Sequence, residues 1–462
     1  TYSKMSTDAV STSSPGKLGS WGCIGHLTES QNADLIQFLE KANPDDIDVA
    51  KFRVESKESA SLRFLRARDF SVSKALTLLS DCVKRKLAEK VDEYVSLTAN
   101  EVACCDVEAM KKWYPHTQLG FDKLNRPVLF EHSGGVNSTA LLHMTTLDHL
   151  IKYHWWTMEN ELNRMFEVAA SQGSVTISTC VILDLAGMNL SHFSPHAMEH
   201  LKAIVAIDNT CYPELLGKML VINAPWIAIS MWDVLKGWLD PRTQAKIEIM
   251  RAGADSSNKL LEFISANQLP RAYGGSGDTA YCSCRDADST DFVHIPRGGH
   301  LSRSVLVGAG QSLLVDSYLG EGEVGLEVWA TSKAPATHSK GDVDKDGHPG
   351  ELLRKELIKH ADSHPHRLLL QLDNSSPAQR TFTVTWTNPA RFYSRALTYV
   401  LTVVDPLDGL AAKVGKLEVV EKKDAAAATE QQTQKAESTS TLAAESPVSD
   451  GGKAQVEQPE NN

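Results

Sequence analysis

The sequence predicts a multidomain protein with three folded parts: an N-terminal helical bundle, an α/β domain with a largely parallel sheet, and an all-β sandwich. Apolar residues recur at helical spacing near the N-terminus, then gather in short runs between helical spans, and finally follow a period of two. With 462 residues the chain has room for two or three domains. Disordered tails are expected at both ends.

The helical bundle is predicted over residues 26–95, after a disordered N-terminus at residues 1–25. The first residues are rich in Ser and Thr and have no apolar core, so they do not resemble a secretory signal. Beyond them, several apolar groups repeat at the spacing of one helix face. These groups are Leu35, Phe38 and Leu39, then Leu62 and Leu65, then Ala75, Leu78, Leu79 and Cys82.

The α/β domain is predicted over residues 96–278, where short apolar runs alternate with helical spans. The runs are rich in β-branched residues and show almost no alternation, which indicates strands buried on both faces. Strand and helix in turn predict a largely parallel sheet with right-handed crossovers. The runs are PVLFEH from Pro127, SVTISTCVILDL from Ser174, KMLVIN from Lys218 and AKIEIM from Ala245, and the helical spans are residues 146–166, 195–207, 226–238 and 258–264.

The β-sandwich is predicted over residues 290–406, because apolar side chains there occupy every second position. Such alternation is typical of antiparallel strands with one buried face. The tail at residues 411–462 contains no Phe, Trp or Tyr and cannot bury enough apolar surface to fold. The alternating sets are Val324, Leu326 and Val328; Leu368, Leu370 and Leu372; Phe382, Val384 and Trp386; and Leu397, Tyr399, Leu401 and Val403.

The charge and the cysteine content limit which partners the protein can bind and in which compartment it is expected. The chain has 58 acidic and 47 basic residues, a net charge of −11, so its surface as a whole repels nucleic acid. No stretch resembles a membrane span of about 20 apolar residues. The eight cysteines are scattered without the spacing of a disulfide framework or a zinc site. We therefore expect a cytoplasmic protein with reduced thiols and no nucleic-acid partner.

Signatures of enzymes and of metal sites are missing. The segment with Gly274 and Ser276 comes nearest to a Gly-x-Ser-x-Gly nucleophile motif, but Asp278 replaces the last glycine. Asp342–Gly347 resembles the opening of a calcium loop, yet Leu353 stands where the closing acid belongs. No phosphate-binding glycine loop is present. We expect no catalytic residue, no metal and no cofactor apart from a bound ligand.

The helical span 226–238 is the most informative feature of the α/β domain. Its stripe of apolar side chains is typical of a core helix. Three tryptophans in this one segment, followed at once by the polar and basic LDPRTQAK, favour instead a site for an amphiphile with a buried tail and an anionic head. The residues expected to line the cavity or form its gate are Trp226, Ile227, Met231, Leu235 and Trp238.

Five ordered motifs carry a resemblance to a known family: LRFLRARDF from Leu62, DLAGM from Asp184, YPELLGKMLVINAP from Tyr212, WLDPRTQAKI from Trp238 and LPRAYGG from Leu269. Over about residues 28–278 the chain resembles CRAL-TRIO proteins of the yeast Sec phosphatidylinositol-transfer type. The part that begins with FVHIPRGG at Phe292 is similar to a GOLD domain. The same pairing occurs in animal tocopherol-associated Sec-like proteins and in plant patellins.

The resemblance implies a set of headgroup-binding residues: Arg68, Glu214, Thr243 and Lys246 match the family's phosphoinositide positions. Arg68 and Lys246 would neutralise the phosphodiester, while Glu214 and Thr243 would bind inositol hydroxyls. The alternative is a simple ion pair between Glu214 and Lys246. Asp69 stands where a basic residue commonly follows the arginine. Ser191, after Asn189, is the candidate for a headgroup hydroxyl.

The resemblance implies non-enzymatic binding and transfer or presentation of a phosphoinositide-type phospholipid between membranes, through a gated hydrophobic cavity. A carrier of a neutral hydrophobic ligand such as a tocopherol is the alternative, and an enzyme acting on lipid is a third class. The implied partners are a phospholipid or other hydrophobic small molecule, a transiently contacted membrane surface, and a protein bound by the GOLD domain. A peripheral location at Golgi or endosomal membranes and a role in vesicle trafficking would follow.

Overall fold

The computed structural model describes residues 21–174, 177–239, 241–252, 255–277, 290–319, 322–331, 350–359 and 366–404. The C-terminal tail, the calcium-like loop Asp342–Gly347 and most of the N-terminal tail lie outside the described residues. Residues 21–25, assigned above to a disordered N-terminus, are described, and the Trp21 ring packs edge-on against Phe70 with centroids 5.3 Å apart. Within the described residues, no helix combines the length and the apolar character needed to cross a bilayer.

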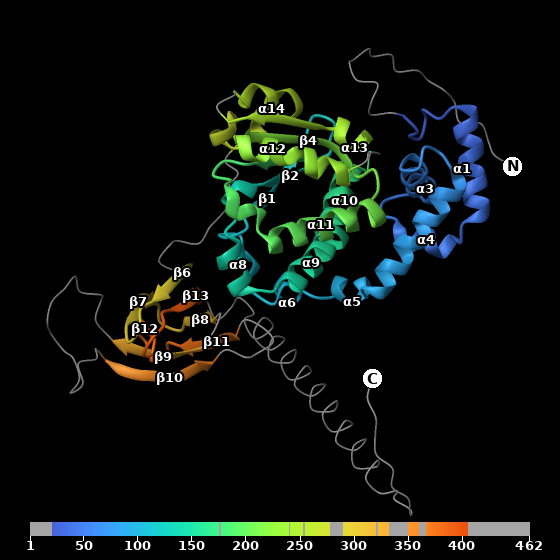
Figure 1. Ribbon diagram of the computed structural model, residues 1–462. Coiled ribbons are helices and arrows are strands. Elements are labelled where there is room, and N and C mark those ends of the chain that lie inside the picture. The colour runs from blue at the N-terminus through green and yellow to red at the C-terminus, as the bar shows by residue number, and fades with distance from the viewer. Residues whose placement is uncertain are drawn as a thin grey trace, which may run out of the picture. The chain divides into compact units, whose positions relative to one another are not determined.

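The predicted N-terminal helical part is confirmed (Figure 1). Thr28 and Gln31 form a capping box that begins the first helix. The helices share a core that includes Phe38, Phe64 and Leu65, and Phe166 of a later helix packs into it. The helices are α1 Glu29–Lys41, α2 Pro44–Ala50, α3 Lys57–Arg66, α4 Val72–Ala88, α5 Val91–Val95, α6 Ala99–Ala103 and α7 Val107–Met110.

The α/β domain contains one five-stranded sheet with the order β1-β2-β3-β4-β5. Strands β2 to β5 run parallel, and β1 pairs antiparallel with β2, so the predicted largely parallel sheet is confirmed. Strand β1 was not predicted, because its sequence HTQLGF is polar and contains a bulge. The strands are β1 His116–Phe121, β2 Pro127–Glu131, β3 Thr179–Asp184, β4 Leu216–Ala224 and β5 Ile247–Arg251.

All four predicted helical spans are present between or after these strands. The first is interrupted by a π-helical turn, and the third ends in a 3-10 turn. The elements are η1 Ser133–Gly135, α8 Ser138–Met144, α9 Leu147–Trp156, η2 Thr157–Leu162, α10 Asn163–Ser171, η3 Leu190–Phe193, α11 Pro195–Cys211, α12 Trp226–Leu235, η4 Lys236–Trp238, α13 Pro241–Ala245, α14 Ser257–Phe263, η5 Ala266–Gln268 and η6 Arg271–Tyr273.

The two faces of this sheet differ in burial. On one face, strand side chains such as Phe130, Ile182 and Leu220 are fully buried, and Leu260 of α14 packs among them. On the other face, one register-aligned row across four strands is only partly buried. The expectation of strands buried on both faces is therefore wrong for this second face. The row, called the open row below, consists of Leu129, Val181, Met219 and Ile247.

The C-terminal part is a sandwich of two four-stranded sheets, with the orders β10-β9-β12-β7 and β11-β8-β13-β6. Alternating side chains of β9, β12 and β13 are buried in one core, and Trp386 and Tyr399 are its largest members. This arrangement fits the GOLD-like domain expected from the sequence. The strands are β6 Thr290–Ile295, β7 His300–Val307, β8 Ser312–Leu319, β9 Glu323–Thr331, β10 Glu351–Lys359, β11 His366–Asp373, β12 Arg380–Thr387 and β13 Arg395–Val404.

Candidate functional site

Glu214 lies at the centre of a group of basic side chains. Its carboxylate Oε2 is 3.0 Å from Arg66 Nη2 and 3.0 Å from Lys246 Nζ, and its Oε1 is 3.4 Å from Arg242 Nε. The Glu214 side chain is only 4% exposed. One buried carboxylate therefore contacts three cations, which is more than the single ion pair considered as the alternative. We call Glu214, Arg66, Arg242 and Lys246 the basic cluster.

Three segments that are far apart in the sequence bring the basic cluster together. Arg66 is the last residue of α3, and Glu214 lies between α11 and β4 in the left-handed backbone region, with φ of 60°. Within LDPRTQAK, Pro241–Ala245 form the short helix α13, and Lys246 follows it directly, four residues after Arg242. The amide of Lys246 donates to the carbonyl oxygen of Thr243, at 3.1 Å. Of the predicted headgroup residues, the structure thus brings Glu214, Thr243 and Lys246 to one place.

Arg68, the fourth predicted headgroup residue, has a different contact. Its Nη1 donates to the carbonyl oxygen of Ala67 at 2.8 Å, and it is Arg66 that contacts Glu214. The sequence motif LRFLRARDF contained both arginines, but spacing alone could not tell which of them faces the carboxylate. Arg66 and Arg242 were therefore missed, although both lie within the motifs quoted above.

Arg242 links the basic cluster to the N-terminal segment. Its Nη1 is 2.9 Å from Oδ1 of Asp69, whose side chain is 86% exposed. Its guanidinium also lies over the Trp21 ring, 4.9 Å from the centroid. The acid that replaces the family's usual basic residue is therefore an ion-pair partner of Arg242, as well as a negative charge beside the cluster.

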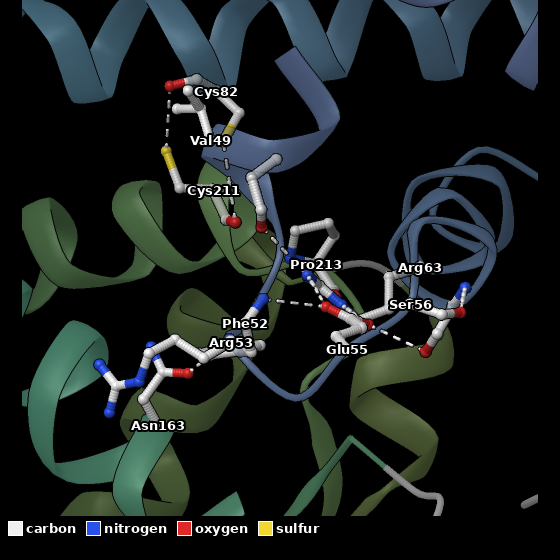
Figure 2. Close-up of polar contacts among 12 residues, drawn as sticks. Val49, Phe52, Arg53, Glu55, Ser56, Arg63, Cys82, Asn163, Cys211 and Pro213 are labelled. Atoms are coloured by element: carbon white, nitrogen blue, oxygen red, sulfur yellow. Dashed lines mark hydrogen bonds and ion pairs between the residues drawn. The ribbon is translucent and has the colours of Figure 1, made fainter. Parts of the chain in front are cut away.

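A buried polar network fixes the backbone next to Glu214 (Figure 2). Arg63 forms two hydrogen bonds with the Glu55 carboxylate, both 2.8 Å, and both side chains are buried. The same guanidinium donates to the carbonyl oxygens of Ala50 and Pro213, at 3.2 and 3.4 Å. Since Pro213 precedes Glu214, this network holds the cluster's carboxylate in position.

Helix α12, the predicted gate, is apolar but poorly buried. Trp226 is 76% exposed, and none of the α12 residues whose side chains are described is fully buried. Ala228 and Ile229 pack beside Met219 and Ile247 of the open row. Helix α12 therefore packs on the second face of the sheet while its own apolar side chains stay partly exposed. The other predicted gate residues, Ile227, Met231, Leu235 and Trp238, are all partly exposed.

Helix α11 also has many apolar residues, but few of them are buried. Only Ile207 and Cys211 are buried among its 17 residues, and Leu201 is exposed. On α11, Nδ2 of Asn209 donates to the carbonyl oxygen of Trp238 at 3.1 Å, which ties the helix to the end of the segment 226–238.

The open row was not predicted from the sequence. Its only signal was the lack of alternation, which indicates two apolar faces but not which one the protein itself covers.

A polar group lies on the same face of the sheet as the open row. Glu131, two residues after Leu129 on β2, accepts hydrogen bonds from Tyr114 Oη at 3.1 Å and Ser133 Oγ at 2.7 Å. Burial raises the pKa of the Glu131 carboxyl. Ser191, the predicted headgroup hydroxyl, is exposed, and its Oγ donates to Asn189 Oδ1 at 2.7 Å. Ser133 and Tyr114 therefore place hydroxyls on this face, whereas the Ser191 hydroxyl bonds within its own turn.

Comparison with known proteins gives consistent matches. The model of the CRAL/TRIO domain family matches residues 111–275. The chain is 36% identical over 231 residues to phosphatidylinositol/phosphatidylcholine transfer protein SFH7 of Arabidopsis thaliana, covering 49% of this chain and 39% of that protein. The chain thus spans well under half of that plant relative.

Two yeast relatives are matched over most of their length. Identity to the SEC14 cytosolic factor of Candida glabrata is 30% over 259 residues, covering 56% of this chain and 82% of that protein. Identity to CRAL-TRIO domain-containing protein YKL091C of Saccharomyces cerevisiae is 30% over 264 residues, covering 55% of this chain and 81% of that protein. The aligned lengths exceed that of the domain-family match.

Proposed function

Because the chain belongs to the CRAL/TRIO family of SEC14-like proteins, we propose that it binds a phospholipid and transfers or presents it between membranes, without making or breaking a covalent bond. The plant relatives are named phosphatidylinositol/phosphatidylcholine transfer proteins, which supports this proposal. We infer a phosphoinositide-type lipid as the preferred ligand.

The single observation that carries the proposal is the open row beside the basic cluster. An apolar sheet face that the protein leaves partly exposed is costly in water, and acyl chains would cover it at a gain of about 0.8 kcal/mol per buried CH₂. Met219 and Ile247 of that row lie on β4 and β5, which are preceded by Glu214 and Lys246 respectively. Tail and head sites are therefore adjacent in the same two strands.

The basic cluster has the composition of a phosphate site. Arg66, Arg242 and Lys246 carry three positive charges against the two negative charges of Glu214 and Asp69, and Arg68 lies two residues after Arg66. In our proposal the arginines and Lys246 bind the phosphodiester, which suits both the guanidinium fork and the ammonium point charge. The Glu214 carboxylate accepts hydrogen bonds from inositol hydroxyls, and the Thr243 hydroxyl donates to them.

Helix α12 is the proposed gate. It opens at a bilayer, where the exposed Trp226 ring finds the interfacial environment that tryptophan prefers. One lipid then enters with its acyl chains against the open row, and the helix closes over it with Ile227, Met231, Leu235 and Trp238. Closing keeps the site dry, which the hydrophobic gain requires.

A direct test of the headgroup assignment is phosphoinositide binding by Lys246→Ala, with Lys259→Ala as the matched control. Both lysines pair with a glutamate at 3.0 Å, but Lys259 pairs with Glu248, outside the basic cluster. Loss of a hydrogen bond to a charged group costs about 1.5–3 kcal/mol, so we expect about a tenfold or greater loss for Lys246→Ala only. Equal effects of the two changes would contradict the assignment.

A neutral hydrophobic ligand such as a tocopherol remains the second candidate, favoured by one observation. The group formed by Glu131, Tyr114 and Ser133 offers hydroxyls and a carboxyl whose raised pKa favours its uncharged form. A neutral ligand has no phosphate, so its binding would be unchanged by Lys246→Ala and weakened by Tyr114→Phe. Binding of a phosphoinositide would instead be weakened more by Lys246→Ala than by Tyr114→Phe.

We propose that the GOLD-like sandwich acts as the membrane or protein adaptor, and that the protein works at the cytoplasmic face of Golgi or endosomal membranes. The sandwich supports this role because its alternating strands bury one shared core and so build a scaffold. Deletion of residues 292–405 should leave lipid extraction largely intact and change localisation. Loss of both would contradict a separate adaptor role.

A further inference from the structure

The turn between β12 and β13 places two aromatic side chains in water. Phe392 is 77% exposed and Tyr393 is 68% exposed, and together with Trp226 they are the most exposed aromatic side chains of the described residues. Isolated exposed apolar residues are common, but two adjacent rings on one turn form a patch. The lipid-binding site does not account for them, since they belong to the sandwich.

Hydrogen bonds tie this turn to a neighbouring turn, so the rings are exposed in a hydrogen-bonded conformation. Asn388 is completely buried, and its Nδ2 donates to the carbonyl oxygens of Ile295, Pro296 and Tyr393 at 3.0, 3.2 and 2.9 Å. Its backbone amide donates to the carbonyl oxygen of Gly299 at 2.9 Å. One buried side chain thereby fastens the β12–β13 turn to the β6–β7 turn. We call residues 296–299 and 388–395 the tip of the sandwich.

The tip is basic on a chain that is acidic overall. It contains Arg297, Arg391 and Arg395 and no acidic residue, whereas the whole chain carries −11. Arg297 and Arg391 are exposed. The adjacent turn, where Gly322 lies against Arg395, carries the acids Glu321 and Glu323 in the sequence, so the three arginines outnumber the two acids. A surface of this kind attracts an anionic partner.

We propose that the tip docks the sandwich onto an anionic membrane surface. Phe392 and Tyr393 enter the headgroup layer, where aromatic rings are favoured, and Arg297 and Arg391 pair with lipid phosphates. Both rings are largely exposed to solvent, which suits insertion into a bilayer. This surface rests on the adaptor role proposed above for the sandwich and names the residues that would carry it, without touching the transferred lipid.

The experiment is flotation of the full chain with phosphatidylcholine vesicles prepared with and without phosphatidylserine. All variants carry Trp226→Ser, which removes the exposed aromatic of the gate helix. We expect phosphatidylserine to increase binding. The double change Phe392→Ser and Tyr393→Ser should reduce it at least about tenfold, and Arg391→Gln or Arg297→Gln about fivefold each. Leu306→Ser, a 44% exposed position on β7, is the matched control and should bind unchanged.

Two results would overturn the proposal: binding that does not depend on phosphatidylserine, or tip variants that float like the control. The second result would favour a protein as the partner of this surface. The arginine variants leave the rings and the Asn388 contacts in place, so they test the charge without disturbing the turn. Native mass spectrometry of the wild-type chain and of the tip changes made without Trp226→Ser reports bound lipid separately, with the proposed gate intact. A protein that floats normally but carries no lipid contradicts the proposed function and leaves the tip assignment standing.

Discussion

The Nη1 atom of Arg63 donates to the carbonyl oxygen of Pro213, 3.4 Å away, immediately before the carboxylate that organises the basic cluster. Helix α3 thus contributes twice: Arg63 fixes the backbone beside Glu214, and Arg66 contacts its carboxylate at 3.0 Å. The N-terminal helices are therefore part of the candidate headgroup site, and damage to their buried polar network should affect both stability and ligand binding.

Arg63→Met tests this network. It leaves the buried Glu55 carboxylate without its bidentate partner, and breaking a buried pair in this way costs about 3–5 kcal/mol. Urea unfolding of the variant should show that loss in the free energy of unfolding. Lys57→Met, which breaks the exposed pair with Asp48, is the control and should change it by less than about 1 kcal/mol. Similar losses in both variants would mean that the buried Arg63 network contributes no more to the free energy of unfolding than an exposed ion pair.

Asp69→Asn should strengthen phosphoinositide binding. The change removes a negative charge that lies 2.9 Å from Arg242 and leaves that guanidinium available to a phosphate. Because Asp69 is largely exposed, solvent screens the interaction, and the expected gain is no more than about fivefold. Isothermal titration with a short-chain phosphatidylinositol would measure it. Weaker binding by Asp69→Asn would show that the carboxylate helps to position Arg242 for the ligand.

Met231→Asn tests the gate. A polar amide on the partly exposed apolar side of α12 opposes closure over acyl chains, so lipid loading from vesicles should fall by about tenfold. Ser230→Asn, at the exposed neighbouring position on the same helix, is the control for effects on the helix itself. Lipid extraction by Met231→Asn at the wild-type level would exclude α12 as the gate.

Acidification should destabilise the protein through His116. Its Nδ1 donates to the carbonyl oxygen of Tyr114 at 2.8 Å, and its Nε2 lies 3.2 Å from Tyr153 Oη. Burial lowers the pKa of His116 from 6.5 to about 4. Below pH 6.5 the unfolded chain therefore binds a proton that the folded chain does not, and stability falls until about pH 4.

The measurement is the free energy of unfolding as a function of pH for the wild type and His116→Gln. The difference between the two curves isolates His116 from other groups that titrate in the same range, including His200, whose pKa burial also lowers to about 4. We expect the wild type to lose up to about 1.4 kcal/mol more per pH unit between pH 6.5 and 4. Parallel curves would contradict the assignment of a buried neutral ring.

Much of the fold could be predicted, and the exceptions have physical reasons. Strands β2 to β5 were found because apolar β-branched runs are distinctive, whereas β1 was missed because an edge strand such as HTQLGF can be polar. In the sandwich, strict alternation revealed β9, β11, β12 and β13. Strand β10 escaped because its side chains, from Glu351 to Lys359, are mostly exposed on both faces.

The candidate site was predicted less completely than the fold. Glu214 and Lys246 were found through motifs, and they are in contact. Arg66 and Arg242 required the structure, because only the folded chain shows which of several arginines points at a given carboxylate. The open row could not be recognised either. A run of apolar residues indicates that both faces of a strand avoid water, but not that one face is reserved for something other than protein.

The central claim is that acyl chains lie against the open row, and photocrosslinking tests it most directly. The protein would be loaded from vesicles with a phosphatidylinositol that carries a diazirine in one acyl chain, irradiated, digested and mapped by mass spectrometry. We predict adducts at Val181, Met219 and Ile247, and none at Ile182 or Leu220 on the opposite, buried face of the same strands. Adducts confined to other surfaces, or equal labelling of the two faces, would contradict the account.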